Sequence, residues 1–225
     1  RVLRDQLFSS MLEEQLRLTP FARDEFEDAY ESTSNPVEQA RRPIIKAFMG
    51  FGSASIHNTT GFRTLATTRP PTGFRSNSNR SGTTPAHDWA NYPEQIANFC
   101  DRLAGIVIEN RDARALISQH DNPEALFYVD PPYPFGTRSD HGKDYTHEMS
   151  DDDHRALAET LHTVRGSVVL SGYGCALYDT ELYPGWQRHE RAHLADGAAK
   201  RIEVVWLNAH CSAKLSEERS QHGLD

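Results

Sequence analysis

The chain has 225 residues, of which 37% are hydrophobic and 25% are charged, a composition typical of a globular protein with one good core and room for a smaller appended lobe. It contains no apolar run of membrane-spanning length and no signal-peptide pattern, so we expect a cytoplasmic protein without a membrane partner. Its three cysteines form no CxxC pair and its eleven histidines show no ligand spacing, which argues against a disulfide framework and a metal site.

The formal net charge of -8 counts against a nucleic-acid partner, but the charge is unevenly distributed along the chain. From Gly61 to His87 there is no acidic residue, and four arginines lie in this stretch. A flexible polar insertion that binds nothing would have a similar composition. Because the stretch is wholly cationic in an acidic chain, we favour a DNA-binding surface. Its expected contact residues are Arg63, Arg69, Arg75, Asn77, Asn79 and Arg80.

Helices are expected before this basic stretch. Residues 1–16 are amphipathic, with Leu3, Leu7, Met11 and Leu12 on one face and no visible N-cap, which predicts a helix that starts before the given sequence. Thr19-Pro20 and Asn35-Pro36 each combine a capping side chain with a proline suited to the first helical position. They predict two further helices, followed by a region poor in regular structure that reaches to about residue 88.

After Trp89 the pattern changes to alternating helices and strands. Ser150 and Asp153 have the spacing of a capping box at the start of a helix. The chain after Leu215 is polar and is expected to fray. Helices are predicted over residues 93–103, 113–119 and 150–164, strands over 106–108, 126–129 and 168–171, and a closing antiparallel hairpin over 186–194 and 202–207. This order predicts an α/β fold with a doubly wound sheet.

The most informative stretch is the predicted strand 126–129 with the four residues after it, Asp130, Pro131, Pro132 and Tyr133. Neither proline has an N–H to donate, so the strand must end there and the chain must turn out at the carboxyl edge of the sheet, where open α/β sheets bind ligands. The carboxylate and the first proline carbonyl can accept hydrogen bonds from an amine, and the tyrosine ring can stack on a planar base.

Asp130-Pro131-Pro132-Tyr133 resembles the signature of amino-group methyltransferases, in the form favoured by N6-adenine DNA methyltransferases of the Dam-like, phage-type branch. The resemblance implies S-adenosylmethionine as cofactor, double-stranded DNA as partner and these four residues as catalytic. It also implies that Asp130 and Asp112 bind the cofactor, although Asp112 would equally serve as an ordinary helix N-cap. Leu170-Ser171-Gly172-Tyr173 resembles the next strand-end motif of the family.

The same resemblance implies a division of the chain into functional regions. Residues 1–16 would end the N-terminal part of the catalytic domain, residues 17–97 would form the target-recognition region, residues 98–215 the Rossmann-like catalytic domain, and residues 216–225 a polar tail. The Gly-rich cofactor loop of the family is not found before Asp130, since Gly50-Phe51-Gly52 follows a predicted helix. We therefore expect the N-terminal strands of the sheet to lie outside this sequence.

The expected activity is transfer of a methyl group from S-adenosylmethionine to the N6 amine of an extrahelical adenine in DNA. Two alternatives remain open from the sequence. One is a catalytically incomplete DNA-binding fragment or one half of a split methyltransferase, and the other is an enzyme that acts on N4 of cytosine or on RNA. The recognition sequence and the oligomeric state cannot be deduced from these residues.

Overall fold

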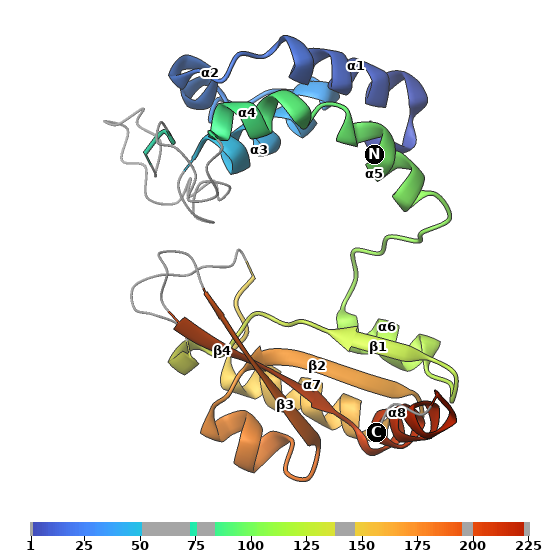
Figure 1. Cartoon of the computed structure of the whole chain (residues 1–225). Coiled ribbons are helices and arrows are strands. Elements are labelled where there is room, and N and C mark those ends of the chain that lie inside the picture. The colour runs from blue at the N-terminus through green and yellow to red at the C-terminus, as the bar shows by residue number, and fades with distance from the viewer. Residues whose placement is uncertain (1, 51–72, 76–83, 138–146, 195–199, 223–225) are drawn as a thin grey trace. The chain divides into compact units, whose positions relative to one another are not determined.

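The chain forms two compact units, Arg1–Ile108 and Glu109–Asp225, which we call the helical unit and the sheet unit. The computed structural model, shown in Figure 1, describes residues 2–50, 73–75, 84–137, 147–194 and 200–222. None of the helices in these ranges is both long enough and apolar enough to cross a membrane.

The helical unit is built around a small core of aliphatic and aromatic side chains. Its centre includes Leu16, Ile45 and Met49, all with essentially no exposed surface, and Trp89, whose indole N–H donates to the Thr19 carbonyl at 2.8 Å. The elements are a short 3-10 turn η1 (Val2–Arg4) and the helices α1 (Gln6–Leu18), α2 (Arg23–Asp28), α3 (Pro36–Met49), α4 (Pro85–Asn91) and α5 (Gln95–Leu103).

The first helix differs from the sequence prediction. Asp5 caps α1, because its carboxylate accepts the backbone N–H of Phe8, so the expectation of an uncapped helix was wrong. The predicted apolar face was wrong in part: Leu12 is buried and Leu3 packs against the core, but Leu7 is 67% exposed and Met11 is exposed, and Leu16 is buried in their place. The pattern of apolar residues in α1 allowed two faces, and packing against η1, α3 and α5 selects the one that carries Leu12 and Leu16.

One helix start was misplaced and one helix was not predicted, and each case has a local reason. The Thr19 hydroxyl donates to the Gln15 carbonyl at 2.6 Å and so helps to close α1, which leaves α2 to begin at Arg23 without a side-chain cap. Helix α4, which lies partly in the region expected to be irregular, begins with Thr84 as N-cap and Pro85 at its first turn. This is the same cap-plus-proline signal that correctly predicted the start of α3 at Asn35-Pro36.

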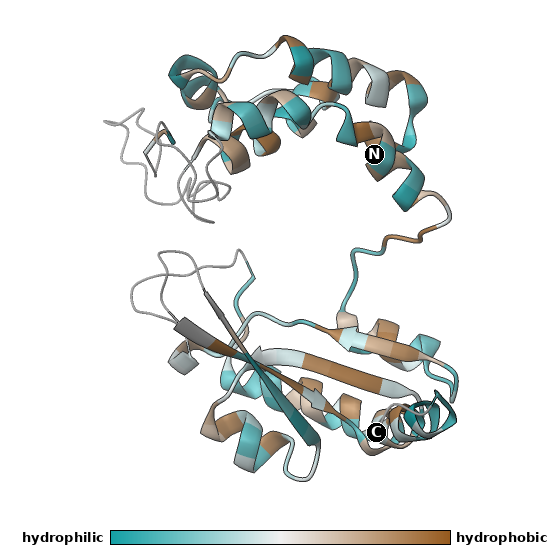
Figure 2. Ribbon diagram, viewed as in Figure 1, coloured by the Kyte–Doolittle hydropathy of each residue, from teal (hydrophilic) through white to brown (hydrophobic). Residues whose placement is uncertain are grey.

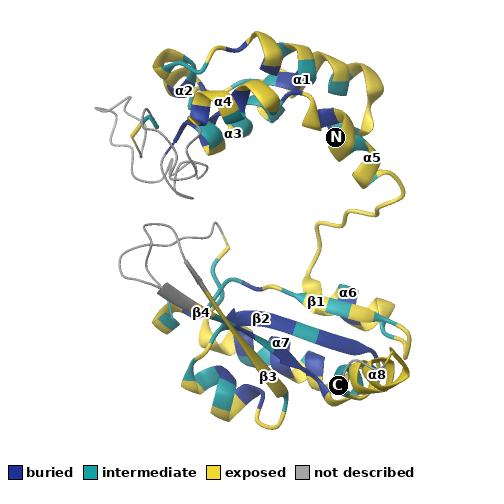
Figure 3. Ribbon diagram, viewed as in Figure 1, coloured by how far each residue is buried: buried dark blue, intermediate teal, exposed yellow. Residues whose placement is uncertain are grey.

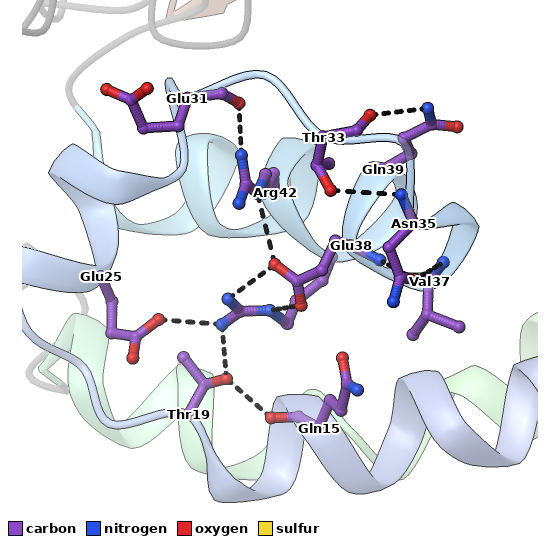
Figure 4. Close-up of polar contacts among 11 residues, drawn as sticks. Gln15, Thr19, Glu25, Glu31, Thr33, Asn35, Val37, Glu38, Gln39 and Arg42 are labelled. Carbon is purple, nitrogen blue, oxygen red and sulfur yellow. Dashed lines mark hydrogen bonds and ion pairs between the residues drawn. The ribbon is translucent and has the colours of Figure 1, made fainter.

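A network of ion pairs joins α2 and α3 on the helical unit, and Figure 4 shows the contacts around Glu38. Arg41 donates to Glu38 at 2.6 Å, to Glu25 at 2.8 Å and to the Thr19 hydroxyl at 2.9 Å. Arg42 also donates to Glu38, at 3.2 Å. The hydrogen bonds from Arg41 hold the pKa of Glu38 below its usual value, so the carboxylate stays charged where it is only 20% exposed.

The sheet unit contains a four-stranded sheet in the order β1-β2-β4-β3, and β2 is the most deeply buried strand in Figure 3. β1 pairs in parallel with β2, with Val129 opposite Leu170, and the other two pairings are antiparallel. Its strands are β1 (Leu126–Val129), β2 (Ser167–Tyr173), β3 (Gln187–Leu194) and β4 (Lys200–Leu207), and its main helices are α6 (Ala113–His120), α7 (Asp151–Thr163) and α8 (Ala209–His222).

The core of the sheet unit lies between the sheet and α7. Val168 and Leu170 of β2 are completely buried, and they pack in one cluster with Leu161 of α7 and Trp206 of β4. Figure 2 shows the apolar residues concentrated along β2. A six-residue π-helical segment, Leu177–Leu182, adds Tyr178 to this cluster, and α8 packs on β2 and β4. A mixed α/β fold is therefore confirmed.

The local predictions for the chain after Trp89 were largely correct, and two were wrong. The four residues of β1, the capping box of Ser150 and Asp153 and the closing hairpin occur as predicted. Residues 216–222 do not fray, because α8 continues to His222. Residues 106–108 form no strand: among the described residues they pair with no other strand, and Val107 is 81% exposed. β-branched residues favour a strand only where pairing and burial are available.

Candidate active site at the carboxyl ends of β1 and β2

The turn after β1 brings a carboxylate, two prolines and an aromatic ring to the carboxyl end of the parallel strand pair. Pro131 is buried and anchors the turn, whereas Asp130 is exposed and Tyr133 is half-buried. Since the prolines carry no N–H, the β1 ladder cannot continue past Val129. The carboxylate therefore lies in the turn, outside the hydrogen-bonded ladder, where it can meet a ligand.

A cavity of about 650 Å³ adjoins this turn. It is bounded by residues 127–132, by the start of α6 and by His147–Met149 before α7. Its volume falls within the range of about 300–1,000 Å³ that is usual for small-molecule sites. Its walls combine apolar side chains such as Ile117 and Phe127 with the two acids that the sequence singled out, Asp112 and Asp130.

Asp112 has a structural task as well as a place in the cavity wall. It is the N-cap of α6, with one carboxylate oxygen accepting the backbone N–H of Ala115 at 3.1 Å and the other lying 3.5 Å from the Arg114 guanidinium. The hydrogen bond from Ala115, followed by the effects of Arg114, lowers the pKa of Asp112. Asp112 therefore is the helix N-cap that the sequence allowed as an alternative role. Its side chain is also 57% exposed and lines the cavity.

Tyr133 turns toward the end of β2. Its hydroxyl lies 3.4 Å from the Ser171 hydroxyl, and its ring meets that of Tyr173 edge to face, with 4.8 Å between the centroids and an interplanar angle of 75°. Burial raises the pKa of Tyr133 to about 12, helped by the carboxylates of Asp130 and Glu203. The phenol is consequently protonated, and neutral, throughout the physiological pH range.

Of the residues expected to contact DNA, the structure describes Arg75 alone. Its backbone N–H donates to the Met49 carbonyl at 2.7 Å, beside an isolated bridge between Gly50 and Phe74, and its side chain is half-buried. Phe74 packs against Phe21 and Phe26 in the helical core. The remaining predicted contacts, Arg63, Arg69, Asn77, Asn79 and Arg80, lie outside the described residues.

Two groups at the site were not assigned a role from the sequence. His147–Met149 line the cavity, and nothing in their local pattern could have shown it, because they reach the cavity only through the fold. Ser171 and Tyr173 were noted as part of a strand-end motif, but their contacts with Tyr133 depend on the parallel pairing of β1 with β2. Within the described residues there is no group of three or more His, Cys, Asp or Glu that could hold a metal ion.

A carboxylate and a cavity at the carboxyl ends of parallel strands define an α/β protein with a ligand site at its sheet edge. A family model described as D12 class N6 adenine-specific DNA methyltransferase matches residues 70–199, more than half of the chain. The chain belongs to this family and is an enzyme of DNA adenine methylation. The matched range includes β1, the turn at Asp130 and β2. A search of curated proteins finds no match.

Proposed function

We propose that this chain transfers a methyl group from S-adenosylmethionine to the N6 amine of an adenine that has left the DNA duplex. The observation that carries the proposal is the exposed Asp130 carboxylate, held beside a cavity by a turn of two prolines at the end of β1. The family of the chain supports adenine over cytosine as the target. A DNA substrate also supports the cytoplasm as the site of action.

The chemistry requires that the adenine amine be made nucleophilic. Its lone pair is delocalised into the base, and hydrogen bonds from its N–H groups to the Asp130 carboxylate and the Pro131 carbonyl would draw the nitrogen toward tetrahedral geometry. The same two acceptors would fix the direction in which the lone pair points. The contribution of the protein is therefore positioning and electrostatic stabilisation, without a covalent intermediate on the enzyme.

The cavity beside Asp130 fits the chemical character of the cofactor. S-adenosylmethionine is cationic at sulfur and carries amino groups, and when bound it would supply an electrophilic methyl group for the N6 amine. Asp112 and Asp130 offer carboxylates that would accept hydrogen bonds from it, and the lowered pKa of Asp112 keeps that group charged. Apolar residues such as Phe127 would cover its flat adenine ring.

The N6 amine is out of reach inside a stacked duplex, so the target base must rotate out of it. Tyr133 is suited to receive the base, since its ring lies directly after the two prolines and part of its surface stays accessible. Stacking on this ring would replace part of the stacking energy that the base loses on leaving the duplex. Asp130, Pro131, Pro132 and Tyr133 thus act together in the proposal.

We assign double-stranded DNA binding to residues 17–97 and catalysis to residues 98–215. The absence of acidic residues from Gly61 to His87 supports the first assignment, because it leaves a cationic segment in an acidic chain. The proposed phosphate and base contacts are Arg63, Arg69, Arg75, Asn77, Asn79 and Arg80. In this assignment Phe74, which packs in the helical core, anchors the middle of the segment.

The test is the variant Asp130→Ala in the full-length protein, measured by tritiated-methyl incorporation into duplex DNA. We expect at least about a hundredfold loss of turnover, the scale for removing one preorganised electrostatic partner. Asp130→Asn should be impaired nearly as strongly, because the amide loses the charge. DNA affinity and the thermal melt should stay at their wild-type values.

Asp152→Ala is the matched control, since Asp152 is a 92% exposed carboxylate at the start of α7 that does not line the cavity. It should leave methyl transfer unchanged. Near-normal turnover in Asp130→Ala would refute the role assigned to Asp130, and a collapsed melt would make it a structural turn residue. RNA and single-stranded DNA are included as substrates, so that a preference for either is detected directly.

A further inference from the structure

The carboxyl end of β2 carries two side chains that face the same way as the ring of Tyr133. Ser171 and Tyr173 are two residues apart on a strand, so both project from one face of the sheet. The Ser171 hydroxyl lies 3.4 Å from the Tyr133 hydroxyl, and the Tyr173 ring meets the Tyr133 ring edge to face at 4.8 Å. The contact with Ser171 fixes the position of the Tyr133 hydroxyl, and the contact with Tyr173 fixes the orientation of the Tyr133 ring.

β2 is a firm support for these contacts, whereas Tyr133 lies in the turn after a strand. Val169–Tyr173 of β2 pairs with β4, β1 pairs with β2 as far as Leu170, and Ser171 is only 7% exposed. Gly172, between the two contact residues, faces the opposite side, where a Cβ atom would come within 3.3 Å of Trp206 and 3.4 Å of Tyr178. The side chains of Trp206 and Tyr178 therefore pack directly against the β2 backbone between Ser171 and Tyr173.

We infer that Ser171 and Tyr173 are positioning residues that set the orientation of the Tyr133 ring for stacking on the target adenine. This inference rests on the proposed function, because it names how that site is ordered. An edge-to-face contact with Tyr173 leaves at least one face of the Tyr133 ring uncovered by it, and that face is available to a base. Ordering the ring before the base arrives reduces the entropy lost on stacking.

A double-mutant cycle tests the inference through turnover and KM for DNA. Tyr173→Leu should lower kcat about 3- to 10-fold, with KM for DNA changed less than about twofold, since an aromatic pair has a strength of this order. Tyr173→Phe keeps the ring and should restore wild-type turnover. In a Tyr133→Leu background, Tyr173→Leu should have no further effect, because Tyr173 acts only through Tyr133. Additive losses in the double variant would overturn the inference.

A second double-mutant cycle tests the hydroxyl contact between Ser171 and Tyr133. It keeps the inference testable if Tyr173→Leu lowers the melting temperature of the protein. Ser171→Ala should lower kcat about 2- to 3-fold in the wild-type protein and should have no effect in Tyr133→Phe, which lacks the partner hydroxyl. Equal losses in both backgrounds would mean that Ser171 supports β2 itself and not Tyr133.

A spectroscopic arm separates failure of this inference from failure of the proposed function. In protein labelled with ¹³C in the tyrosine rings, the Tyr133 signals are assigned by their loss in Tyr133→Phe. Tyr173→Leu should shift these signals, because the neighbouring ring current is removed, and Tyr173→Phe should leave them in place. Unchanged signals in Tyr173→Leu would overturn the positioning role, whether or not the protein methylates DNA. A wild-type protein that transfers no methyl group would refute the proposed function alone.

Discussion

Two acids, Glu38 in the helical unit and Asp130 in the sheet unit, use their carboxylates in opposite ways. In the helical unit, Glu38 accepts hydrogen bonds from two guanidiniums and Glu25 is bound to one of them, so these carboxylates are committed to joining α2 and α3. In the sheet unit, Asp130 is exposed after β1, and none of the ion pairs among the residues that the structure describes involves it. An acid bound to arginines stabilises the fold, and an acid left at a strand end is available to a ligand.

Asp112 lies between these two cases. It caps α6, as a structural acid would, and it also lines the cavity with Asp130. The comparison therefore predicts different losses for the three kinds of acid environment: stability in the helical unit, activity at Asp130, and some of each at Asp112. The predictions below test this separation.

Removal of Arg41 should give the largest change in stability. Arg41→Ala leaves Glu25 and Glu38 without their shared partner in a site where both are at most 30% exposed. We expect the free energy of unfolding, measured by urea denaturation, to fall by about 2–3 kcal/mol, somewhat less than for a fully buried pair. Turnover of the folded fraction should be unchanged.

Arg17→Ala is the control for that measurement, because the ion pair of Arg17 with Glu13 is a surface contact. It should cost about 0.5 kcal/mol or less. If the two variants lose the same stability, the ion-pair network around Glu38 has no special role, and the comparison with Asp130 fails.

Tyr133 tests whether the site needs a ring or a hydroxyl. Tyr133→Ala should weaken binding of an extrahelical base by about 1–3 kcal/mol, because stacking requires the ring. Tyr133→Phe keeps the ring and should lose only about the 2- to 3-fold in activity that the hydroxyl contact with Ser171 contributes. Binding is measured on duplexes in which the target adenine is mismatched and therefore easily extruded. Similar losses in the two variants would point to the hydroxyl and remove the stacking role.

Substitutions can separate the two roles of Asp112, as helix cap and as a proposed contact of the cofactor. Asp112→Ala removes both the helix cap and the carboxylate, and the lost cap should cost about 1 kcal/mol of stability. Asp112→Ser keeps a capping oxygen and removes the charge, so its melt should stay close to that of the wild type. If cofactor affinity, measured by calorimetry, falls equally in both variants, the carboxylate contacts the cofactor. A fall in Asp112→Ala alone would make Asp112 a helix cap only.

The smallest expected effect concerns the basic segment. If its arginines contact phosphates, the logarithm of DNA affinity should fall with the logarithm of salt concentration by about 0.9 per contact. The double variant Arg75→Ala, Arg80→Ala should reduce this slope by about two such contacts. Arg155→Ala, which removes a guanidinium already paired with Asp152 and Glu181, should leave the slope unaltered. An unaltered slope in the double variant would show that the segment does not bind phosphate.

The sequence predicted those elements of the structure that depend on residues close together in the chain, and it failed for those that depend on distant partners. β1, the capping box at Ser150 and the closing hairpin follow from neighbouring residues, and all three were predicted. The buried face of α1 and the absence of a strand at residues 106–108 depend on partners elsewhere in the chain, and both were mispredicted. The turn at Asp130 was readable, because two consecutive prolines end a strand by themselves.

The same distinction applies to the candidate site. The resemblance implied that Asp112 and Asp130 both bind the cofactor, and the structure places both on one cavity, although the strand predicted before Asp112 at residues 106–108 is not formed. Their chemical roles remain predictions. The contacts of Tyr133 with Ser171 and Tyr173 join residues about 40 positions apart and required the pairing of β1 with β2.

The opposite end of β2 affects how mutational data on this enzyme should be read. Buried Asn208 accepts the Val168 N–H at 3.0 Å and donates to the Gly166 carbonyl at 2.9 Å, so it fixes the start of β2. At Gly166 itself a Cβ atom would lie 2.7 Å from the Ala125 carbonyl oxygen, which leaves no space for a side chain. In a screen of random variants scored by DNA methylation, both positions would appear as intolerant as the site residues. A parallel screen for folded protein would separate them, since losses at Gly166 and Asn208 would appear in both screens and losses at Asp130 in only one.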